Sequence, residues 1–286
     1  AAGDLNGDGL ADFVISSYAS DLLGQQTDVG SVSVIFGATS RPAVLDLREL
    51  SDPTVGFQIT GSASTYYLGF SIAVGDINAD GKRDFLMGTY SEAYVIYGQA
   101  YPTRSPTVLP STKPTSAPTA QWQYPQDASV TTFVTGNPDT GSGFRLYGGT
   151  TDAQAGTTVR GVGDVNGDGI DDFVVVAPQA SRLGRFNCGV VYVVYGNTSR
   201  TVTDIDLLHF TTGIDGYRII GATADDRIGV ISPRRGDFNG DGIADILIGI
   251  PDYKVNGVSL TGAAYILFGS ATRSTDVDLL SFTSGT

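Results

Sequence analysis

The chain of 286 residues is poor in the side chains that most often carry chemistry, with one Cys, one His, one Met and one Trp. A single Cys cannot form a disulfide within the chain, so a disulfide framework is excluded. Only 17 Lys and Arg stand against 30 Asp and Glu, a net charge of −13. This balance argues against a general nucleic-acid binder, which needs clustered positive charge. No apolar run approaches the roughly 18 residues of a membrane span, so none is expected in this segment.

Glycine and aromatic residues are abundant instead. The sequence has 38 Gly, 14 Tyr and 13 Phe, and 41% of its residues are hydrophobic. Apolar content of this size is enough for a sizeable core. Many Gly residues among aromatic and β-branched ones are typical of short strands joined by tight turns. The composition therefore predicts an all-β fold.

An acidic string recurs four times along the chain. The copies are GDLNGDGLADF from Gly3, GDINADGKRDF from Gly75, GDVNGDGIDDF from Gly163 and GDFNGDGIADI from Gly236. Each copy is followed by an apolar run and then by a second apolar run that ends in an aromatic residue and Gly. Those second runs are SVSVIFG at 31–37, AYVIYG at 93–98, VVYVVYG at 190–196 and AAYILFG at 263–269. Such short runs bounded by Gly predict strands, and their common phase predicts a repeat protein.

The second repeat is longer than the others because it holds an insertion. The leading Asp residues of the four strings are 72, 88 and 73 positions apart. Between 101 and 121, Pro falls every four residues from Pro102 to Pro118. Proline lacks the N–H donor that a sheet needs, so 101–121 is expected to be an extended spacer outside the sheets. Its many Thr and Ser residues also suit O-glycosylation.

The acidic strings have the spacing of an oxygen-ligand metal loop. Counting from the first Asp, positions 1, 3, 5 and 9 carry side-chain oxygens, position 6 is Gly and position 7 offers its carbonyl. In loop one these are Asp4, Asn6, Asp8 and Asp12, with Gly9 and the Leu10 carbonyl. The other predicted ligands are Asp76, Asn78, Asp80, the Lys82 carbonyl and Asp84 in loop two; Asp164, Asn166, Asp168, the Ile170 carbonyl and Asp172 in loop three; and Asp237, Asn239, Asp241, the Ile243 carbonyl and Asp245 in loop four.

Hard oxygen ligands without His or Cys favour Ca²⁺ over Zn²⁺, and such multidentate cages suit Mg²⁺ poorly. A single Asp-Gly string would be typical of an ordinary turn, whereas four copies that keep every ligand position favour up to four calcium sites. Loop two is the weakest match, because Ala79 replaces the Gly at position 4 and Lys82 and Arg83 bring positive charge. Loop three has an additional Asp171, which is expected to face solvent.

These loops are not EF-hands. An EF-hand needs an acidic ligand at position 12 and flanking helices. Position 12 is Ile15, Met87, Val175 or Ile248, and the flanks are predicted strands. The metal is therefore expected on a β-hairpin, where it neutralises three neighbouring carboxylates and links loop order to strand pairing. The predicted ligand positions of the four loops hold twelve of the 30 acidic residues, which leaves 18 against 17 basic ones, so most of the negative charge belongs to the predicted metal sites.

At this level the chain resembles the FG-GAP repeats of the integrin α-subunit N-terminal domain. The resemblance is carried by LGFSIAVGDINADGKRDF at 68–85, GDVNGDGIDDFVVVAP at 163–178, GDFNGDGIADILIGIP at 236–251 and the VYVVYG type of strand. It implies a β-propeller of four-stranded blades, seven in that family, in which the calcium loop joins two adjacent strands of one blade. The four repeats are expected to belong to such a seven-bladed or longer array within a longer polypeptide.

The resemblance also implies one propeller-type domain, incomplete at both ends. Residues 1–100 would hold repeats one and two (start), 101–121 the Pro/Thr-rich spacer, and 122–286 the remainder of repeat two with repeats three and four. The implied function is a non-enzymatic, calcium-stabilised extracellular propeller for adhesion, recognition or structural assembly in a cell-surface coat or extracellular filament. Partners would be other proteins or glycans at the cell surface, or further copies of the chain. Asn197 begins a glycosylation sequon, which favours secretion.

Two other classes stay open. A hydrolase-associated propeller is one, but His209 and Cys188 are the only residues of their types and have no partner in the repeat phase, so packing or surface roles are expected for both. The Asp residues are better explained as metal ligands than as paired general acids. A glycan-binding propeller is the other, in which exposed Tyr side chains stack on sugars. The candidates for that role are Tyr66, Tyr67, Tyr90 and Tyr253.

Overall fold

The structure is a computed structural model of the chain. It describes residues 3–21, 27–40, 45–47, 50, 54–61, 67–98, 143–149, 152–198, 203–231, 236–253, 262–273 and 275–282. The predicted Pro/Thr spacer at 101–121 and the candidate Tyr66 lie outside these residues. The proposed division of the domain at 100 and 122 falls outside them as well, and it stays a prediction.

Sixteen strands and no α-helix are found in the described ranges, which confirms the all-β prediction. The strands are β1 (Phe13–Ser17), β2 (Ser31–Ile35), β3 (Gly56–Thr60), β4 (Ser71–Gly75), β5 (Asp84–Gly88), β6 (Ala93–Ile96), β7 (Gly143–Tyr147), β8 (Thr158–Gly163), β9 (Asp172–Ala177), β10 (Val190–Val194), β11 (Ile205–Asp206), β12 (Gly216–Ile220), β13 (Val230–Ile231), β14 (Ile246–Ile250), β15 (Ala263–Leu267) and β16 (Val277–Asp278). Every apolar run that followed an acidic string in the sequence is a strand.

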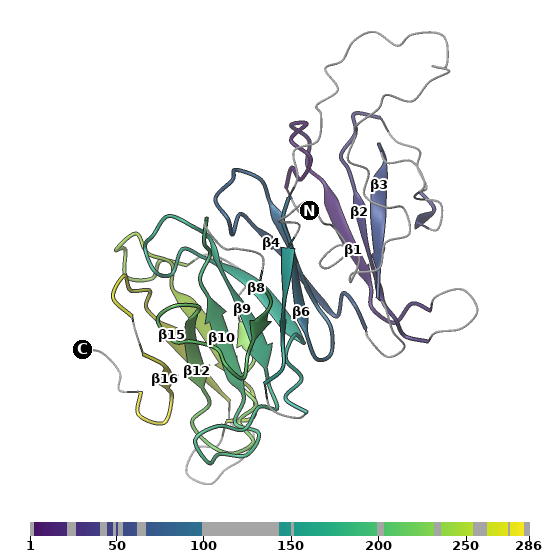
Figure 1. Ribbon diagram of the computed structural model, residues 1–286. Helices are drawn as coiled ribbons and strands as arrows, with labels where there is room; N and C mark the ends of the chain where they lie inside the picture. The colour runs from purple at the N-terminus through teal and green to yellow at the C-terminus, as the bar shows by residue number, and fades with distance from the viewer. Residues whose placement is uncertain are drawn as a thin grey trace, which may run out of the picture.

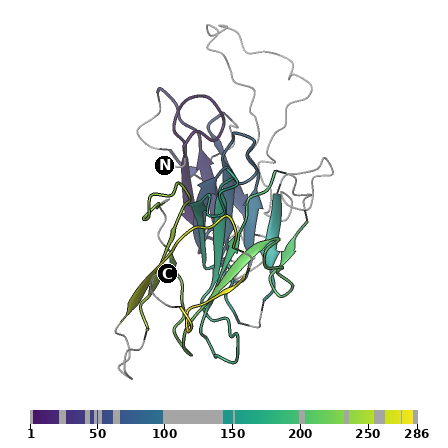
Figure 2. The ribbon, with the colours of Figure 1, turned by 90° about the vertical axis from the view of Figure 1, so that its left-hand side faces the viewer.

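The strands form four sheets, one for each repeat. Sheet I has the order β1-β2-β3, sheet II β11-β7-β6-β5-β4, sheet III β16-β12-β10-β9-β8 and sheet IV β13-β14-β15. They follow one another side by side, from sheet I at the right of Figure 1 to sheet IV at the left. In the turned view the yellow-green strands of sheet IV stand at one edge of the row (Figure 2). Repeated sheets placed side by side are the arrangement expected of propeller blades.

Residue type decides which strands lie in the interior. β9 (DFVVVA) and β10 (VVYVV) are buried along their whole length, so both of their faces are covered. They pair antiparallel, with Val191 opposite Val176. Strands buried on two faces are expected to be continuous runs of Val and other β-branched or aromatic residues. β1 is different, because its exposed and half-buried residues alternate and Phe13 is 51% exposed.

Neighbouring sheets pack through their faces and are also joined by hydrogen bonds. One apolar core contains Leu86 and Phe144 of sheet II together with Phe173 and Val175 of sheet III. The hydroxyl of Ser71, on β4, donates to the Gly156 carbonyl at 3.0 Å and accepts the Val159 N–H of β8 at 3.0 Å. The first strands of sheets II and III are therefore fixed to each other on the inner side of the row.

Sheets II and III have one more strand than the four predicted. The additional strands, β11 and β16, are two residues long and run parallel to β7 and β12. Each comes from the connection that follows the third strand of the next repeat. The Arg145 backbone N–H and Nε of β7 donate to Asp204 at 3.0 and 2.7 Å. The Arg218 backbone N–H and Nη1 of β12 donate to Asp276 at 2.9 and 3.1 Å. The same clasp thus attaches each repeat to the edge of the preceding sheet.

Candidate metal sites in the acidic loops

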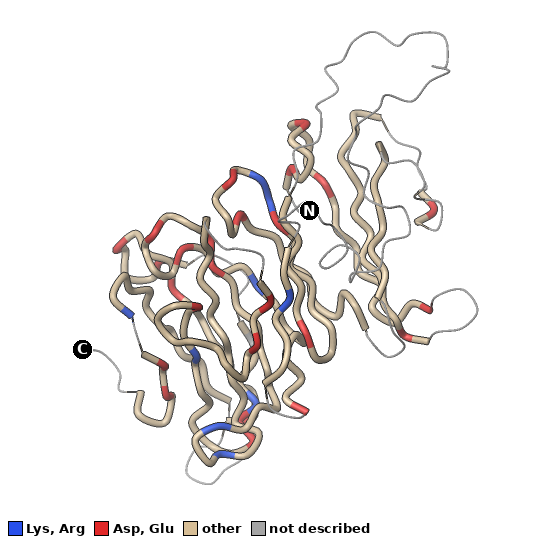
Figure 3. The backbone as a smooth tube through the Cα atoms, in the orientation of Figure 1, with Lys and Arg blue, Asp and Glu red and all other residues tan. Residues whose placement is uncertain are grey.

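The four acidic loops lie at one end of the sheets, the upper end in Figure 1. Loop two joins β4 to β5 and loop three joins β8 to β9, while loop one leads into β1 and loop four into β14. Acidic residues are prominent at this end in the charge view (Figure 3). The sequence predicted that each acidic loop joins two adjacent strands of one sheet, and this is confirmed for loops two and three.

The carboxylate at position 1 organises each loop by accepting backbone N–H groups. In loop one, Asp4 accepts from Gly7 at 2.7 Å, from Asp8 at 3.1 Å and from Gly9 at 2.8 Å. Asp164 and Asp237 do the same in loops three and four. Gly9 has φ +84°, with open space around its missing side chain, so the left-handed backbone alone requires Gly at position 6.

Positions 3 and 5 lie beside the first carboxylate. The Asp8 N–H donates to Asp4 Oδ1 and to Asn6 Oδ1, both at 3.1 Å, so these two predicted ligand oxygens share one donor. Asn6 Nδ2 donates to Asp8 Oδ2 at 3.0 Å, and the Leu10 N–H donates to Asp8 Oδ1 at 2.8 Å. The local sequence therefore brings the oxygens of positions 1, 3 and 5 to one side of the coiled loop.

The carboxylate at position 9 is buried and joins the loop to the sheet. Asp172 is 0% exposed, and its Oδ2 accepts the Val165 N–H of position 2 at 2.8 Å. Its Oδ1 accepts the Gly196 N–H at 2.8 Å. Gly196 is the Gly that ends VVYVVYG after the next strand. The equivalent carboxylates and glycines are Asp12 with Gly37, Asp84 with Gly98 and Asp245 with Gly269.

These four glycines are site residues that the sequence analysis did not identify. A Cβ on Gly98, Gly196 or Gly269 would collide with the carbonyl oxygen of position 8 in its own loop, and a Cβ on Gly37 would meet that oxygen at 2.7 Å. Close approach of two backbones is a condition that only Gly meets. The signal was present in the sequence, because an aromatic-Gly pair ends the second strand of every repeat.

Burial sets the electrostatics of position 9. Desolvation raises the pKa of Asp84 and of Asp172 to about 7, although two backbone N–H donors oppose this shift. The neighbouring Asp residues of each loop raise the same pKa further. For Asp12, burial likewise raises the pKa above its ordinary value. A cation bound beside these groups would lower their pKa, because opposite charge favours the ionised form.

The donor set fits a hard divalent cation such as Ca²⁺. It offers carboxylate, amide and carbonyl oxygens only. Carboxylate oxygens that accept a single N–H, such as Asp4 Oδ2 and Asp8 Oδ1, keep a second lone pair, whereas Asp4 Oδ1 already accepts two N–H groups. Within the described ranges, no three Asp, Glu, His or Cys side chains gather into a ready-made metal-binding group. A cation would therefore have to draw as well on the Asn oxygen at position 3 and the carbonyl at position 7, as the spacing predicted.

Loop two departs from the others where the sequence predicted. Ala79 takes the left-handed φ of +55° that Gly7, Gly167 and Gly240 take elsewhere. Its N–H makes no hydrogen bond to Asp76 in the described structure, whereas those three glycines bond the first carboxylate at 2.6–2.7 Å. Lys82 Nζ lies 3.4 Å from Asp80 Oδ2. One N–H donor is thus lost, and an ammonium group pairs with a predicted ligand.

Successive loops are also connected to each other. The position 8 N–H donates to the position 1 carbonyl of the preceding loop, from Asp171 to Asp76 at 3.3 Å and from Ala244 to Asp164 at 2.8 Å. Asp171 Oδ2 in turn accepts the Asp76 N–H at 3.4 Å. The expectation that Asp171 faces solvent is corrected here, because its carboxylate is turned to the neighbouring loop by the packing of sheet III on sheet II.

The residues considered for catalysis are separated from one another. Cys188 is buried, with Sγ 3.7 Å from the Ala180 carbonyl oxygen. His209 is exposed, and its Nδ1 lies 2.8 Å from Asp206 Oδ2, which lowers the pKa of Asp206. Both observations agree with the expected packing and surface roles. The described residues include no helix that is long and apolar enough to cross a membrane.

The fold and the repeated loops define a β-propeller repeat protein with acidic hairpin loops. The sequence profile of the FG-GAP repeat matches residues 1–35, 68–101, 155–194 and 233–267. The chain therefore belongs to the FG-GAP repeat family. The matched segments contain all four acidic loops and the two strands that follow each of them.

Several characterised proteins share this similarity. Integrin alpha pat-2 of Caenorhabditis elegans is 27% identical over 252 residues, which is 87% of this chain and 17% of that protein. Integrin alpha-PS2 of Drosophila melanogaster is 30% identical over 143 residues, or 49% and 8%. Phosphatidylinositol-glycan-specific phospholipase D of Bos taurus is 38% identical over 109 residues, or 37% and 12%. The chain spans less than a fifth of the length of these relatives.

Proposed function

We propose that this chain is a calcium-stabilised, non-enzymatic propeller module for adhesion, recognition or structural assembly outside the cell. The observation that carries the proposal is the same oxygen-rich loop in four successive sheets, ordered by N–H groups around its first carboxylate. Similarity to integrin α chains over most of this chain supports the adhesion class. In cell-surface coats or extracellular filaments, partners would be proteins or glycans at the cell surface, or other copies of the chain.

Calcium in these loops would act on the fold and not on a substrate. The buried position 9 carboxylate bonds its own loop and the end of a neighbouring strand, so an ion that neutralises it would strengthen strand pairing. Without the ion, three acidic groups within about 4–6 Å repel by a few kcal/mol at an effective dielectric near 20. Because loops two, three and four are hydrogen-bonded in series, order in one loop supports the next.

Thermal unfolding with calcium and with chelator tests this proposal. Binding to the native state alone raises its stability by mass action, so excess calcium should raise the melting temperature by several degrees. The variant Asp164→Asn should reduce that rise, because it removes the carboxylate that organises loop three. Asp152→Asn is the matched control, since Asp152 is exposed and lies outside the loops. Coincident melting curves with and without calcium would refute the proposal.

An extracellular location is supported by the glycosylation sequon at Asn197, which lies on the surface. Asn197 and Thr198 are exposed, and the Asn197 N–H donates to the Ile77 carbonyl of loop two at 3.0 Å. A glycan on Asn197 would project into solvent beside the acidic loops. Mass spectrometry of the secreted chain before and after removal of N-glycans should show Asn197 modified, and an unmodified Asn197 in secreted protein would argue against this assignment.

A hydrolase-associated propeller is the alternative that the phospholipase relatives favour. The aligned region is 12% of the bovine enzyme, and catalysis by that enzyme is a property of the whole protein. In this chain the His209 side chain is 77% exposed and its Nδ1 bonds Asp206, and no Ser, Thr or Cys side chain among the described residues is hydrogen-bonded to its ring. An assay of glycosylphosphatidylinositol cleavage with the purified chain separates the two classes. Turnover that disappears in His209→Ala would replace the non-enzymatic proposal.

A further inference from the structure

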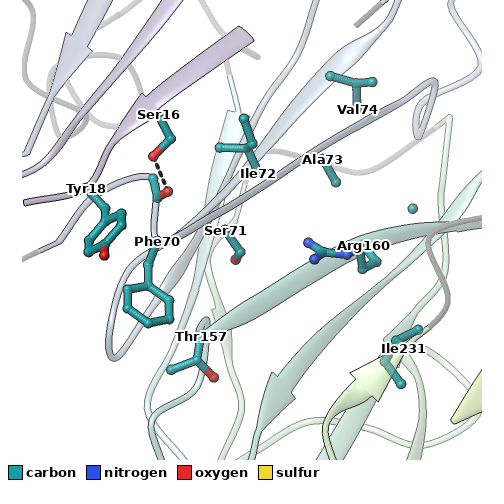
Figure 4. Close-up of a pocket in the computed structure, with 12 residues that line it drawn as sticks. Ser16, Tyr18, Phe70, Ser71, Ile72, Ala73, Val74, Thr157, Arg160 and Ile231 are labelled. Atoms are coloured by element: carbon teal, nitrogen blue, oxygen red, sulfur yellow. Dashed lines mark hydrogen bonds between the residues drawn. The ribbon is translucent and has the colours of Figure 1, made fainter. Parts of the chain in front are cut away.

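A cavity of about 710 Å³ lies on the inner side of the propeller sheets, where four of them meet (Figure 4). β4 and β8 form its walls, Tyr18 contributes from sheet I, and Ile231 contributes from sheet IV. We call it the channel cavity. Its volume falls within the roughly 300–1,000 Å³ of typical ligand sites. It lies away from the candidate metal ligands, none of which lines it.

Among the described residues that line the channel cavity, Arg160 alone is charged. It extends from β8 toward Ser71 on β4 (Figure 4). Its Nη1 donates to the Val159 carbonyl at 2.8 Å, and it has no ion pair with any described residue. A guanidinium carries five N–H donors in a planar fork. Most of its donors are therefore available to a ligand, and none of the described residues that line the hollow is acidic.

Aromatic rings continue from the mouth of the channel cavity onto the surface. Tyr18 and Phe70 line the cavity with ring centroids 5.3 Å apart, and Tyr90 follows Phe70 at 6.0 Å. The three side chains are 49%, 41% and 44% exposed. Contiguous exposed aromatic residues mark interaction sites, and Tyr, Phe and Arg are enriched in the centres of protein interfaces.

We propose that the channel cavity binds an Asp or Glu side chain of a peptide segment presented by a protein partner. The carboxylate pairs with Arg160, and apolar residues beside it in the segment pack on Tyr18 and Phe70. Charge complementarity selects the carboxylate, because a lone cation in a hollow without acidic groups favours an anion. Arg and carboxylate also match in geometry, since both present two parallel hydrogen-bonding atoms. This inference rests on the proposed role of the chain as a recognition module.

The wall chemistry favours a peptide over an acidic sugar. Ile72, Ala73, Val74 and Ile231 offer apolar contact only. The Ser71 hydroxyl is already used by Gly156 and Val159. A sugar has a hydroxyl on most of its carbons, and such groups lose free energy when they are buried without partners. An Asp or Glu side chain brings only its carboxylate into the cavity, and Arg160 can pair with that group.

Peptide arrays on the full chain in calcium provide the test. The probes are acetylated, amidated hexapeptides with apolar flanks and each of the twenty amino acids in turn at one central place. Peptides with Asp or Glu there should bind best. Arg160→Gln should weaken this binding at least about tenfold, the effect of losing a charged hydrogen bond. Arg160→Lys should retain part of it. Arg227→Gln is the matched control and should bind as the unchanged chain does, because Arg227 is exposed and does not line the cavity.

Several outcomes would overturn the inference. These are equal binding of Glu-centred and Gln-centred peptides, no peptide binding, or selective binding of glucuronic or sialic acid oligosaccharides in place of peptides. If Arg160→Gln does not fold, two other measurements decide. Binding of the Glu-centred peptide to the unchanged chain should weaken with added salt. The variant Phe70→Ala should still prefer peptides with a central Asp or Glu. The calcium-dependent rise in melting temperature tests the proposed function separately. If calcium raises the melting temperature but no peptide on the array is preferred, only the proposed binding site in the channel cavity is refuted.

Discussion

Loops two and three have the same backbone plan and different local chemistry. In both, the buried carboxylate at position 9 bonds the position 2 N–H and a Gly N–H, at 2.8 Å in every case. They differ at position 4, where loop three has Gly167 and loop two has Ala79, and at position 7, where Lys82 pairs with Asp80. The anchoring of the loop to the sheet is thus constant, while the residues at positions 4 and 7 of the loop vary.

This difference shows that the loop has two separable parts. The part built on position 9 depends on packing, because its Gly partner has no room for a side chain. The part built on positions 1 to 7 depends on backbone conformation and charge. Position 8 adds a third influence, which acts on the neighbouring loop: Asp171 bonds loop two, and the Arg83 side chain lies against Gly3 at the start of loop one.

The largest effect on stability is expected at the Gly that bonds the position 9 carboxylate, a feature that both loops share. Gly196→Ala and Gly98→Ala should each lower the free energy of unfolding by about 1–3 kcal/mol, because the added methyl group collides with a backbone carbonyl. Urea unfolding in excess calcium measures this. Gly75→Ala is the control, since its nearest neighbours would lie at 3.6–3.8 Å. Equal stability of the Gly75 and Gly196 variants would show that the close approach has no energetic weight.

A reversal of pH dependence should follow from the position 9 carboxylates. In chelator, Asp84 and Asp172 have a folded pKa of about 7 against an ordinary 3.8. Between these values the folded chain holds more protons than the unfolded chain, so stability should fall as pH rises, by up to about 1.4 kcal/mol per pH unit per group. In calcium the ion needs the ionised form, so stability should rise with pH.

Melting temperatures at pH 5 and pH 7.5, with calcium and with chelator, check this reversal. Asp84→Asn and Asp172→Asn should each flatten the slope in chelator, since neither amide titrates. Slopes of the same sign in both conditions would contradict the assignment of these carboxylates to ion-linked sites.

Exchanging the residue at position 4 should bring loop two closer to the others. Ala79→Gly removes a left-handed Ala that costs about 1 kcal/mol, so calcium affinity at loop two should rise roughly fivefold. The mirror variant Gly240→Ala should weaken loop four by a similar factor, because its surroundings are open and only its φ of +76° is unfavourable. Calorimetric titration of calcium measures both, and an unchanged affinity in both variants would exclude backbone strain as the difference.

The smallest effect is expected from the exposed charges around loop two. Lys82→Gln should raise its calcium affinity about two- to fivefold at low salt, with less effect at high salt, since exposed ion pairs are worth about 0.2–1 kcal/mol. Asp171→Asn should lower the affinity of loop two, although Asp171 belongs to loop three. Titration of both variants at two salt concentrations checks this, and a loss confined to loop three would refute the influence between loops.

Much of the local structure could be predicted from the sequence. Three features depend on residues within about a dozen positions of one another. They are the strands after each acidic string, the left-handed Gly at position 6 and the departure of loop two from the pattern of the other loops. Short-range patterns report such features well because strand periodicity and backbone conformation are local properties. The fifth strands β11 and β16 were missed, since nothing near Ile205 or Val277 indicates which edge they join.

The sequence by itself determined the all-β class, the fourfold repeat and the positions of the four acidic loops, in which the oxygen ligands are predicted. The tertiary structure alone decided that Asp84 bonds Gly98, that Asp171 reaches Asp76 across 95 residues, and that Arg160 enters a cavity whose described lining has no acidic residue. These contacts join segments that are distant in the sequence and meet only in the folded chain. The Asp84–Gly98 contact forms within one blade when β5 pairs with β6, whereas the other two arrangements form only when one blade packs on the next.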